Sequence, residues 1–385
     1  MSVDWKAVED KYEAPTYGRY PVVFSHGEGI HLFDTSGKRY TDLYGGHCVS
    51  ILGHTPTRVT EAIYEQSKKL MFYSNVVYNP TRAQAAQKLV EMSPDGFDRV
   101  FFCNSGTEAN ENAIKLAWKM TGKTRMVSTI GGWHGRTLAS LSVTHSEKLR
   151  LPYQFGMPDV SFVPFGDANA LEECLKANPD VAGFILEPIQ SINGCATAPT
   201  SYYKEIREIC DKHDVLLIFD EIQTGVGRTG KFSFSEHVDM RPDLITLAKS
   251  LAAGFPIGAV LMPERIASKL SNGDLGSTFA GGMLASAACY ATLCEIEEQN
   301  YMDHAPKVFE TLENSLENTA IKLHGRGCLI GLELPVDAKP VVATLFEKGW
   351  ITGTSDVPNV MRIMPPIITP LETITEFANT LKNVV

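Results

Sequence analysis

Short apolar runs alternate with amphipathic stretches along most of the chain from about residue 57. The amphipathic stretches have helical spacing, as in "TRAQAAQKLVEM", "EANENAIKLAWKM" and "SYYKEIREICDKH". The brief apolar runs are "RVFFC", "RMVSTI", "VAGFILEP", "VLLIFDE", "LITLA" and "GAVLM". Strands that alternate with helices in this way predict an α/β fold, with a mainly parallel sheet covered by helices on both faces.

The two ends of the chain have a different pattern. Before residue 47, apolar and polar residues alternate around the turn signals "SHGEG" and "TSGK", which predicts a short antiparallel meander. After "GGMLASAACYATLCEIEEQ" the chain returns to helices and short strands, with "GCLIGLEL" as another meander segment. We therefore expect a large α/β domain over 47–280 and a smaller α+β domain built from 1–46 and 281–385.

Composition and charge narrow the class of protein. A chain of 385 residues with 44% apolar and 21% charged residues has the usage of a folded globular protein of about two domains. The net charge of -10 and the lack of a basic run argue against a nucleic-acid partner. The eight cysteines form no CxxC pair, so we expect neither a zinc site nor a disulfide framework, and a reducing cytoplasm. The sequence has no signal-peptide pattern and no membrane-length apolar run, so we expect no membrane partner.

Two apolar runs end in an acid and an amine. Asp220 ends "LLIFD", where a buried carboxylate needs a cationic partner or a proton, and a protonated pyridine nitrogen is such a partner. Lys249 follows "LITLA" and is a candidate for a Schiff base. The alternative is a buried salt bridge between Asp220 and Lys249. In a doubly wound sheet, residues after the strands lie where ligands bind, so both interpretations place these residues at one edge.

A further group of residues follows the run "RVFFC". Ser105, Gly106 and Thr107 open a predicted helix, and its free N–H groups, dipole and two hydroxyls suit a phosphate. Plain N-capping is the alternative. Trp133 in "GGWHGRTL" could stack on a cofactor ring or pack in the core. A phosphate cradle, an acid for a ring nitrogen and an amine for an aldehyde together predict a pyridoxal 5′-phosphate site.

The motifs occur in an order that resembles a known family, the class III pyridoxal-phosphate aminotransferases, in their ornithine and acylornithine branch. The resemblance covers nearly the whole chain. Its motifs are "FFCNSGTEANENAIKLAW", "WHGRTLASLS", "FILEPIQ", "FDEIQTGVGRTGKF", "DLITLAKSLAAGFPIGA", "GSTFAGG", "GCLIGLEL" and "MRIMPP". The resemblance implies a pyridoxal-phosphate-dependent transferase of fold type I.

The resemblance also implies roles for individual residues. Lys249 would bond to the cofactor aldehyde and act as the general base, and Asp220 would pair with the ring nitrogen. Cofactor contacts would come from Ser105, Gly106, Thr107, Trp133, Gln223 and, across a dimer interface, Thr278. Substrate contacts would come from Arg136 and Arg362, which bind carboxylates, and from Ser277. A homodimer with active sites at the subunit interface is therefore expected.

The implied activity transfers the terminal amine of N2-acetylornithine to 2-oxoglutarate, which gives a semialdehyde and glutamate, as in arginine biosynthesis. The sequence leaves open N-succinylornithine or another ω-amine donor, a mutase of the glutamate-semialdehyde type, and a non-catalytic cofactor-binding protein. One departure bears on donor choice. Many relatives have a glutamate two residues after "EPIQ", where it pairs with the second arginine, but this chain has Ile192.

Overall fold

The protein is described by a computed structural model over residues 3–385, in which the largest sheet has seven strands. Their order is β4-β10-β9-β8-β7-β5-β6. The strands are β4 (Arg99–Cys103), β5 (Arg125–Thr129), β6 (Val160–Val163), β7 (Val181–Leu186), β8 (Leu216–Asp220), β9 (Leu244–Leu247) and β10 (Gly258–Met262). The strand β10 runs in the opposite direction to the other six strands of this sheet. The predicted mainly parallel sheet is thus confirmed.

The central strands of this sheet bury both of their faces. Along β7 and β8, alternate side chains enter two separate apolar clusters, as Phe184 and Phe219 do on one face and Ile185 and Ile218 on the other. Successive side chains of a strand point to opposite faces, so near-continuous apolar runs are required when both faces are covered. The same runs were the strongest strand signals in the sequence.

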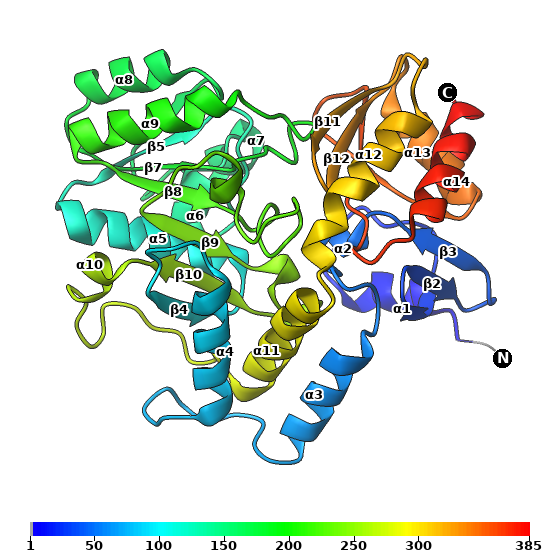
Figure 1. Ribbon diagram of the computed structural model, residues 1–385, viewed down its shortest axis with the longest axis horizontal. Helices are drawn as coiled ribbons and strands as arrows, with labels where there is room; N and C mark the ends of the chain where they lie inside the picture. The colour runs from blue at the N-terminus through cyan, green and yellow to red at the C-terminus, as the bar shows by residue number, and fades with distance from the viewer. Residues whose placement is uncertain (1–2) are drawn as a thin grey trace.

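Helices cover the two faces, as Figure 1 shows. Helix α5 (Gly106–Thr121) contacts β4 and β7 to β10, while α8 (Ala168–Ala177) and α9 (Thr200–His213) pack together and contact β6 and β8. The bounds of α5 follow from its caps. The Ser105 hydroxyl accepts a hydrogen bond from the N–H of Glu108, and Gly122 ends the helix with a φ of 70°, a conformation that favours glycine.

Two smaller sheets lie on the other side of the molecule, where both chain ends also lie (Figure 1). One has the order β1-β2-β3-β13 and the other β11-β12-β15-β14. Their strands are β1 (Phe24–Glu28), β2 (His31–Asp34), β3 (Arg39–Asp42), β11 (Lys322–Arg326), β12 (Leu329–Glu333), β13 (Trp350–Ile351), β14 (Gly353–Thr354) and β15 (Val360–Ile363). The strands β1 to β3 form the predicted antiparallel meander. We propose the domain limits 1–46 with 281–385 and 47–280.

The remaining helices are distributed over both parts of the molecule. They are α1 (Trp5–Tyr12), α2 (Gly45–Cys48), α3 (Thr57–Ser67), α4 (Pro80–Met92), α6 (Leu138–Ser142), α7 (Glu147–Arg150), α10 (Glu264–Ala267), α11 (Met283–Glu298), α12 (Ala305–Ser315), α13 (Ala338–Glu347), α14 (Leu371–Lys382) and the 3₁₀ turns η1 (Leu151–Tyr153), η2 (Phe234–His237), η3 (Lys249–Ala252) and η4 (Tyr301–Asp303). The short turn α2 is left-handed, since φ is positive throughout Gly45–Cys48. Across the described part of the chain, no helix is both long and apolar enough to span a membrane.

Candidate active site

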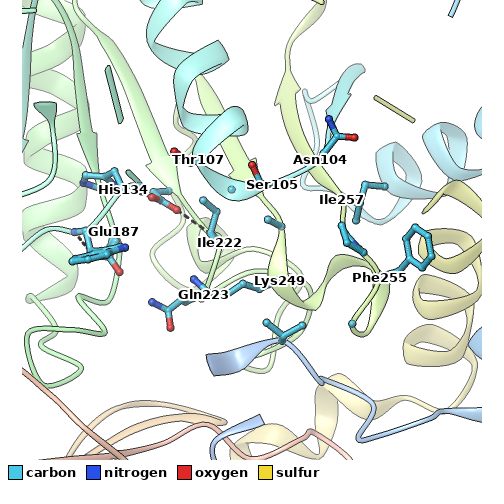
Figure 2. A pocket seen from close by; sticks show the side chains of 18 residues that line it. Asn104, Ser105, Thr107, His134, Glu187, Ile222, Gln223, Lys249, Phe255 and Ile257 are labelled. Carbon is cyan, nitrogen blue, oxygen red and sulfur yellow. Dashed lines mark hydrogen bonds and ion pairs between the residues drawn. The ribbon is translucent and has the colours of Figure 1, made fainter. Parts of the chain in front are cut away.

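A cavity of about 350 Å³ lies at the carboxyl ends of the parallel strands. Figure 2 shows the side chains that line it. Asp220 is the last residue of β8 and pairs with Thr246 of β9, and Lys249 follows the end of β9 by two residues. Of the residues that the sequence assigned to the cofactor, the cavity brings together Ser105, Gly106, Thr107, Trp133, Asp220, Gln223 and Lys249. The expected convergence of the strand ends is therefore observed.

The Asp220 carboxylate is held rigidly at the cavity wall. It is buried, and its Oδ2 accepts hydrogen bonds of 2.7 Å from the Asn110 amide and from Nδ1 of His134. Its Oδ1 accepts one hydrogen bond, of 3.1 Å, from the backbone N–H of Ile222. Because an ionised carboxylate has about four acceptor positions, Oδ1 keeps capacity for a donor within the cavity. A protonated ring nitrogen is a donor of that kind.

The Lys249 amine is free to react. Within residues 3–385, its Nζ has no hydrogen bond and no carboxylate within 4.0 Å, so the alternative of a salt bridge with Asp220 is not observed. The backbone of Lys249 is also unusual, with a φ of 30°. Such a conformation costs a non-glycine residue about 1–3 kcal/mol and persists only where the surroundings hold it.

The start of α5 offers backbone N–H groups to the cavity. The first turn of a helix has no intrahelical acceptors for its N–H groups, and none is found for those of Gly106 and Thr107 among the described residues. Gly106 also has no room for a side chain, because a Cβ there would lie 2.6 Å from the Ile222 side chain. These groups and the positive end of the helix dipole suit an anion such as phosphate.

The Thr107 hydroxyl has a different environment from the one that its motif suggests. It lies 2.8 Å from the Thr137 hydroxyl and 2.6 Å from the Ser140 hydroxyl, and it also accepts from the backbone N–H of Arg136. The sequence interpretation counted two hydroxyl donors for a phosphate. In the structure the Thr107 hydroxyl already has these partners, so we attribute anion binding to the backbone N–H groups and the Ser105 hydroxyl.

The cavity fits pyridoxal 5′-phosphate in its chemistry. It holds a free amine for the aldehyde, a carboxylate with spare acceptor capacity for the ring nitrogen, and a helix N-terminus for the phosphate. Gln223 and Trp133 also line it, and Figure 2 places Gln223 beside Lys249.

The two candidate substrate arginines lie outside the residues that line the cavity. Arg362, on β15, is 5% exposed, and its guanidinium donates to the Thr354 carbonyl, the Ser191 hydroxyl and the Tyr44 hydroxyl at 2.8–2.9 Å. All three partners are neutral, and no carboxylate lies within 4.0 Å of Arg362 in the described chain. A buried cation with neutral partners favours an incoming carboxylate. Arg136 is exposed, and its guanidinium lies 5.2 Å from the Trp133 ring centroid.

The residues of "GSTFAGG" do not line the cavity of their own chain. The Ser277 hydroxyl accepts a hydrogen bond of 2.8 Å from the Asn104 side chain. Thr278 is exposed and lines no part of the cavity. A role of Thr278 in cofactor binding therefore requires a second copy of the chain.

Comparisons with known proteins settle the family. The profile of "Aminotransferase class-III" matches residues 12–385. The chain belongs to the class-III aminotransferases. It is 40% identical to acetylornithine aminotransferase from Methanopyrus kandleri over 95% of both chains, and 36% identical to that from Bacillus subtilis over 96% of both. Ornithine aminotransferase from Toxoplasma gondii has a similar structure, with a TM-score of 0.92 and 30% identity, covering 99% of this chain and 93% of that one.

Family membership confirms the main sequence predictions. The protein is an aminotransferase of fold type I, and its cofactor is pyridoxal 5′-phosphate. The roles of individual residues remain predictions that rest on their placement in the cavity.

The aminotransferase site contains three buried polar residues that the sequence did not single out. Asn110 and His134 hold Asp220, and the Asn110 oxygen accepts a hydrogen bond of 2.7 Å from Thr246. The third is Glu187 of "FILEPIQ", which lines the cavity and accepts a hydrogen bond of 2.8 Å from the backbone N–H of Trp133. Its place directly after an apolar strand was the available signal. Burial raises the pKa of Glu187 to about 7.

Proposed function

We propose that this aminotransferase moves the terminal amine of N2-acetylornithine to 2-oxoglutarate, giving a semialdehyde and glutamate, as a step of arginine biosynthesis. The observation that carries the proposal is the unpaired Lys249 amine in the same cavity as the fixed Asp220 carboxylate. The relatives named acetylornithine aminotransferase, at 36–40% identity over nearly the whole chain, support the choice of donor.

The proposed roles follow from the side chains present. Pyridoxal phosphate supplies an aldehyde that captures amines and a cationic ring that accepts electron density. Asp220 would keep a proton on the ring nitrogen, because its carboxylate is buried and its Oδ1 has spare acceptor capacity. Lys249 would hold the cofactor and, when its amine is free, move a proton at the reacting carbon. Arg362 and Arg136 bind the two carboxylates of 2-oxoglutarate, and Arg136 binds the carboxylate of the donor.

A donor screen tests this proposal. The purified, cofactor-loaded enzyme is incubated with 2-oxoglutarate and either N2-acetylornithine, N2-succinylornithine or ornithine, and glutamate is measured. We expect the highest kcat/KM for N2-acetylornithine. Isomerisation of glutamate 1-semialdehyde without a requirement for 2-oxoglutarate would instead favour the mutase, and the absence of glutamate with every donor would contradict an aminotransferase of this specificity.

We further propose a homodimer. Large apolar side chains are exposed in the segment that joins α3 to α4 and in the "GSTFAGG" segment, where Phe72 and Phe279 pack with ring centroids 5.0 Å apart. The exposed set is Leu70, Met71, Phe72, Tyr73, Val76, Val77, Tyr78 and Phe279. Exposed apolar patches of this kind mark interaction surfaces. The exposed Thr278 is next to Phe279, so this surface would bring it to the site of the other subunit.

Dilution should therefore release the cofactor and dissociate the dimer together. We expect Phe279→Glu to lower the dimer fraction and the cofactor occupancy, because a charge in an apolar interface is costly. Val336→Glu, at an exposed apolar residue outside the patch, is the control. Sedimentation velocity and cofactor absorbance measure the two quantities. A monomer that keeps full occupancy and activity would contradict the proposal.

The presence of Ile192 in place of a glutamate leads to a prediction about donor choice. Its neighbour Ser191 bonds to Arg362, while Asn193 donates to Gln190 and so does not mask Arg362. With no carboxylate at this place, Arg362 stays available in both half-reactions, and the enzyme should tolerate some α-amino acid donors. Ile192→Glu should raise the ratio of kcat/KM for N2-acetylornithine over such a donor by about tenfold, the effect of a partly shielded ion pair.

The measurement requires a folded dimer with full cofactor loading, and Ile192→Gln is the matched control without charge. A ratio that stays the same or falls in Ile192→Glu would mean that the missing carboxylate does not set donor choice here.

We also propose the cytoplasm as the location. All eight cysteines are free, and seven of them are buried. Free thiols are typical of a reducing compartment.

A further inference from the structure

Arg228 is a buried cation that has no counter-ion among residues 3–385. It has an exposed fraction of 0% and is among the largest fully buried side chains described. No carboxylate lies within 4.0 Å of its guanidinium in the part of the chain that the structure covers, and its Nε has no hydrogen-bond partner. Burying a charge in this way is costly. We therefore expect its hydrogen bonds to have a role that an apolar side chain of similar size could not fill.

The guanidinium joins two segments that carry functional side chains. One amino group, Nη1, donates to the carbonyls of Met364 and Pro365, which follow the strand that carries Arg362. The other, Nη2, donates at 3.5 Å to the hydroxyl of Ser250, the residue after Lys249. One side chain thus connects the residue after the reactive lysine with the backbone that follows the strand of the substrate arginine.

Both segments depend on such support. Lys249 has the strained φ of 30°, and the adjacent Ser250 hydroxyl also donates at 3.2 Å to the carbonyl of Cys48 in the left-handed turn α2. On the other side, the N–H of Met364 donates at 2.6 Å to the carbonyl of Leu43. A strained backbone keeps its conformation only where its neighbours fix it. Arg228 is the cation that links these two sets of contacts.

We propose that Arg228, acting through Ser250, is a positioning residue that sets the placement of Arg362 relative to Lys249. The consequence is specific to one half-reaction. In the proposed function, Arg362 binds the carboxylate next to the reacting carbon of 2-oxoglutarate and glutamate, whereas the carboxylate of the acylated donor is bound by Arg136. A change at Arg228 should therefore weaken the half-reaction with 2-oxoglutarate much more than the half-reaction with N2-acetylornithine. This inference rests on the proposed function.

Three variants test the proposal. Arg228→Met removes the charge, Arg228→Lys keeps it without the planar fork, and Ser250→Ala removes only the hydroxyl. We expect KM for 2-oxoglutarate to rise on the order of a hundredfold in Arg228→Met, because even a small misplacement of a binding group can have an effect of this size. In Ser250→Ala, which loses a single hydrogen bond, we expect a rise of about tenfold. Arg228→Lys should fall between them. In all three variants, KM for N2-acetylornithine should stay within about twofold of its value in the unmodified enzyme, because distant, independent sites couple only weakly.

Two further measurements do not depend on turnover. Calorimetry with glutarate, a dicarboxylate that cannot react, should give a Kd that rises in parallel with KM for 2-oxoglutarate. Hydrogen exchange should be faster in Ser250→Ala over 248–254 and 43–48. Thr292→Val is the control, because it removes a buried hydroxyl that bonds to the Ala288 carbonyl within α11. It should change neither glutarate binding nor exchange in those segments.

The possible outcomes distinguish a failure of the proposed function from a failure of the proposed role of Arg228. If the unmodified enzyme forms no glutamate, the proposed function fails. If it is active but folded Ser250→Ala and Arg228→Lys lower both half-reactions equally, or leave glutarate binding unchanged, Arg228 has only a structural role and the inference is overturned. Because Ser250→Ala deletes a single hydroxyl, the test stands even if Arg228→Met does not fold.

Discussion

Lys249→Ala should lower kcat by at least about 10⁴-fold while the protein still binds pyridoxal phosphate. The loss is large because one side chain supplies both the amine that bonds to the cofactor and the group that moves the proton. Binding should persist because Asp220 and the N-terminus of α5 are untouched. The measurements are steady-state glutamate formation and cofactor content by absorbance.

Borohydride reduction distinguishes the covalent role from a merely electrostatic one. Treatment followed by mass spectrometry should attach the cofactor to the unmodified protein and not to Lys249→Ala. Lys269→Ala, at an exposed lysine, is the matched control and should behave as the unmodified protein. An active Lys249→Ala enzyme that keeps a reducible cofactor bond would rule out this assignment.

Asp220→Asn should have the next largest effect, a fall in kcat on the order of 10²–10³-fold. The side-chain oxygen of the new amide can still accept from His134 and Asn110, which leaves its NH₂ where Oδ1 was. That group donates, so it disfavours a proton on the ring nitrogen, and the ring loses its capacity to stabilise negative charge. Absorbance titration of the bound cofactor, with and without substrate, follows this change directly.

Asp243→Asn is the control for the loss of a buried carboxylate. Asp243 is 7% exposed and forms ion pairs with Arg207 and Arg265, at a distance from the cavity lining. We expect it to lower Tm because breaking a buried ion pair is destabilising, with little change in kcat. Equal losses of kcat in the two variants would mean that Asp220 acts through stability alone.

The central strands of the large sheet could be predicted because a strand that is buried on both faces has a continuous run of apolar residues in the sequence. Strands such as β7 and β8 must be apolar at every position, so they stand out from the amphipathic helices between them. The edge strand β6 has four residues that are mostly half-buried, and its pattern did not distinguish it. The pairing of β13 with β3 joins residues 350 and 41, which no local pattern can indicate.

Site residues that directly follow a strand could be predicted from the sequence. Site residues whose role depends on contacts between distant segments could not. Asp220 and Lys249 are unusual residue types at the ends of apolar runs. Asn110 lies near the start of helix α5 and looks like an ordinary polar position in the sequence, yet it bonds to a carboxylate 110 residues away in the chain. Arg228 is similar, because a sequence alone does not reveal whether an arginine has a counter-ion.

The placement of the cavity residues also bears on how such a protein diversifies. Apart from Asp220, the lining residues lie outside the strands, on loops and at helix starts. Substitutions there can alter the choice of donor or acceptor without disturbing the buried alternation on which the sheet depends. Duplicated genes of this kind can therefore acquire new substrates through loop changes, while the frame remains under selection for folding alone.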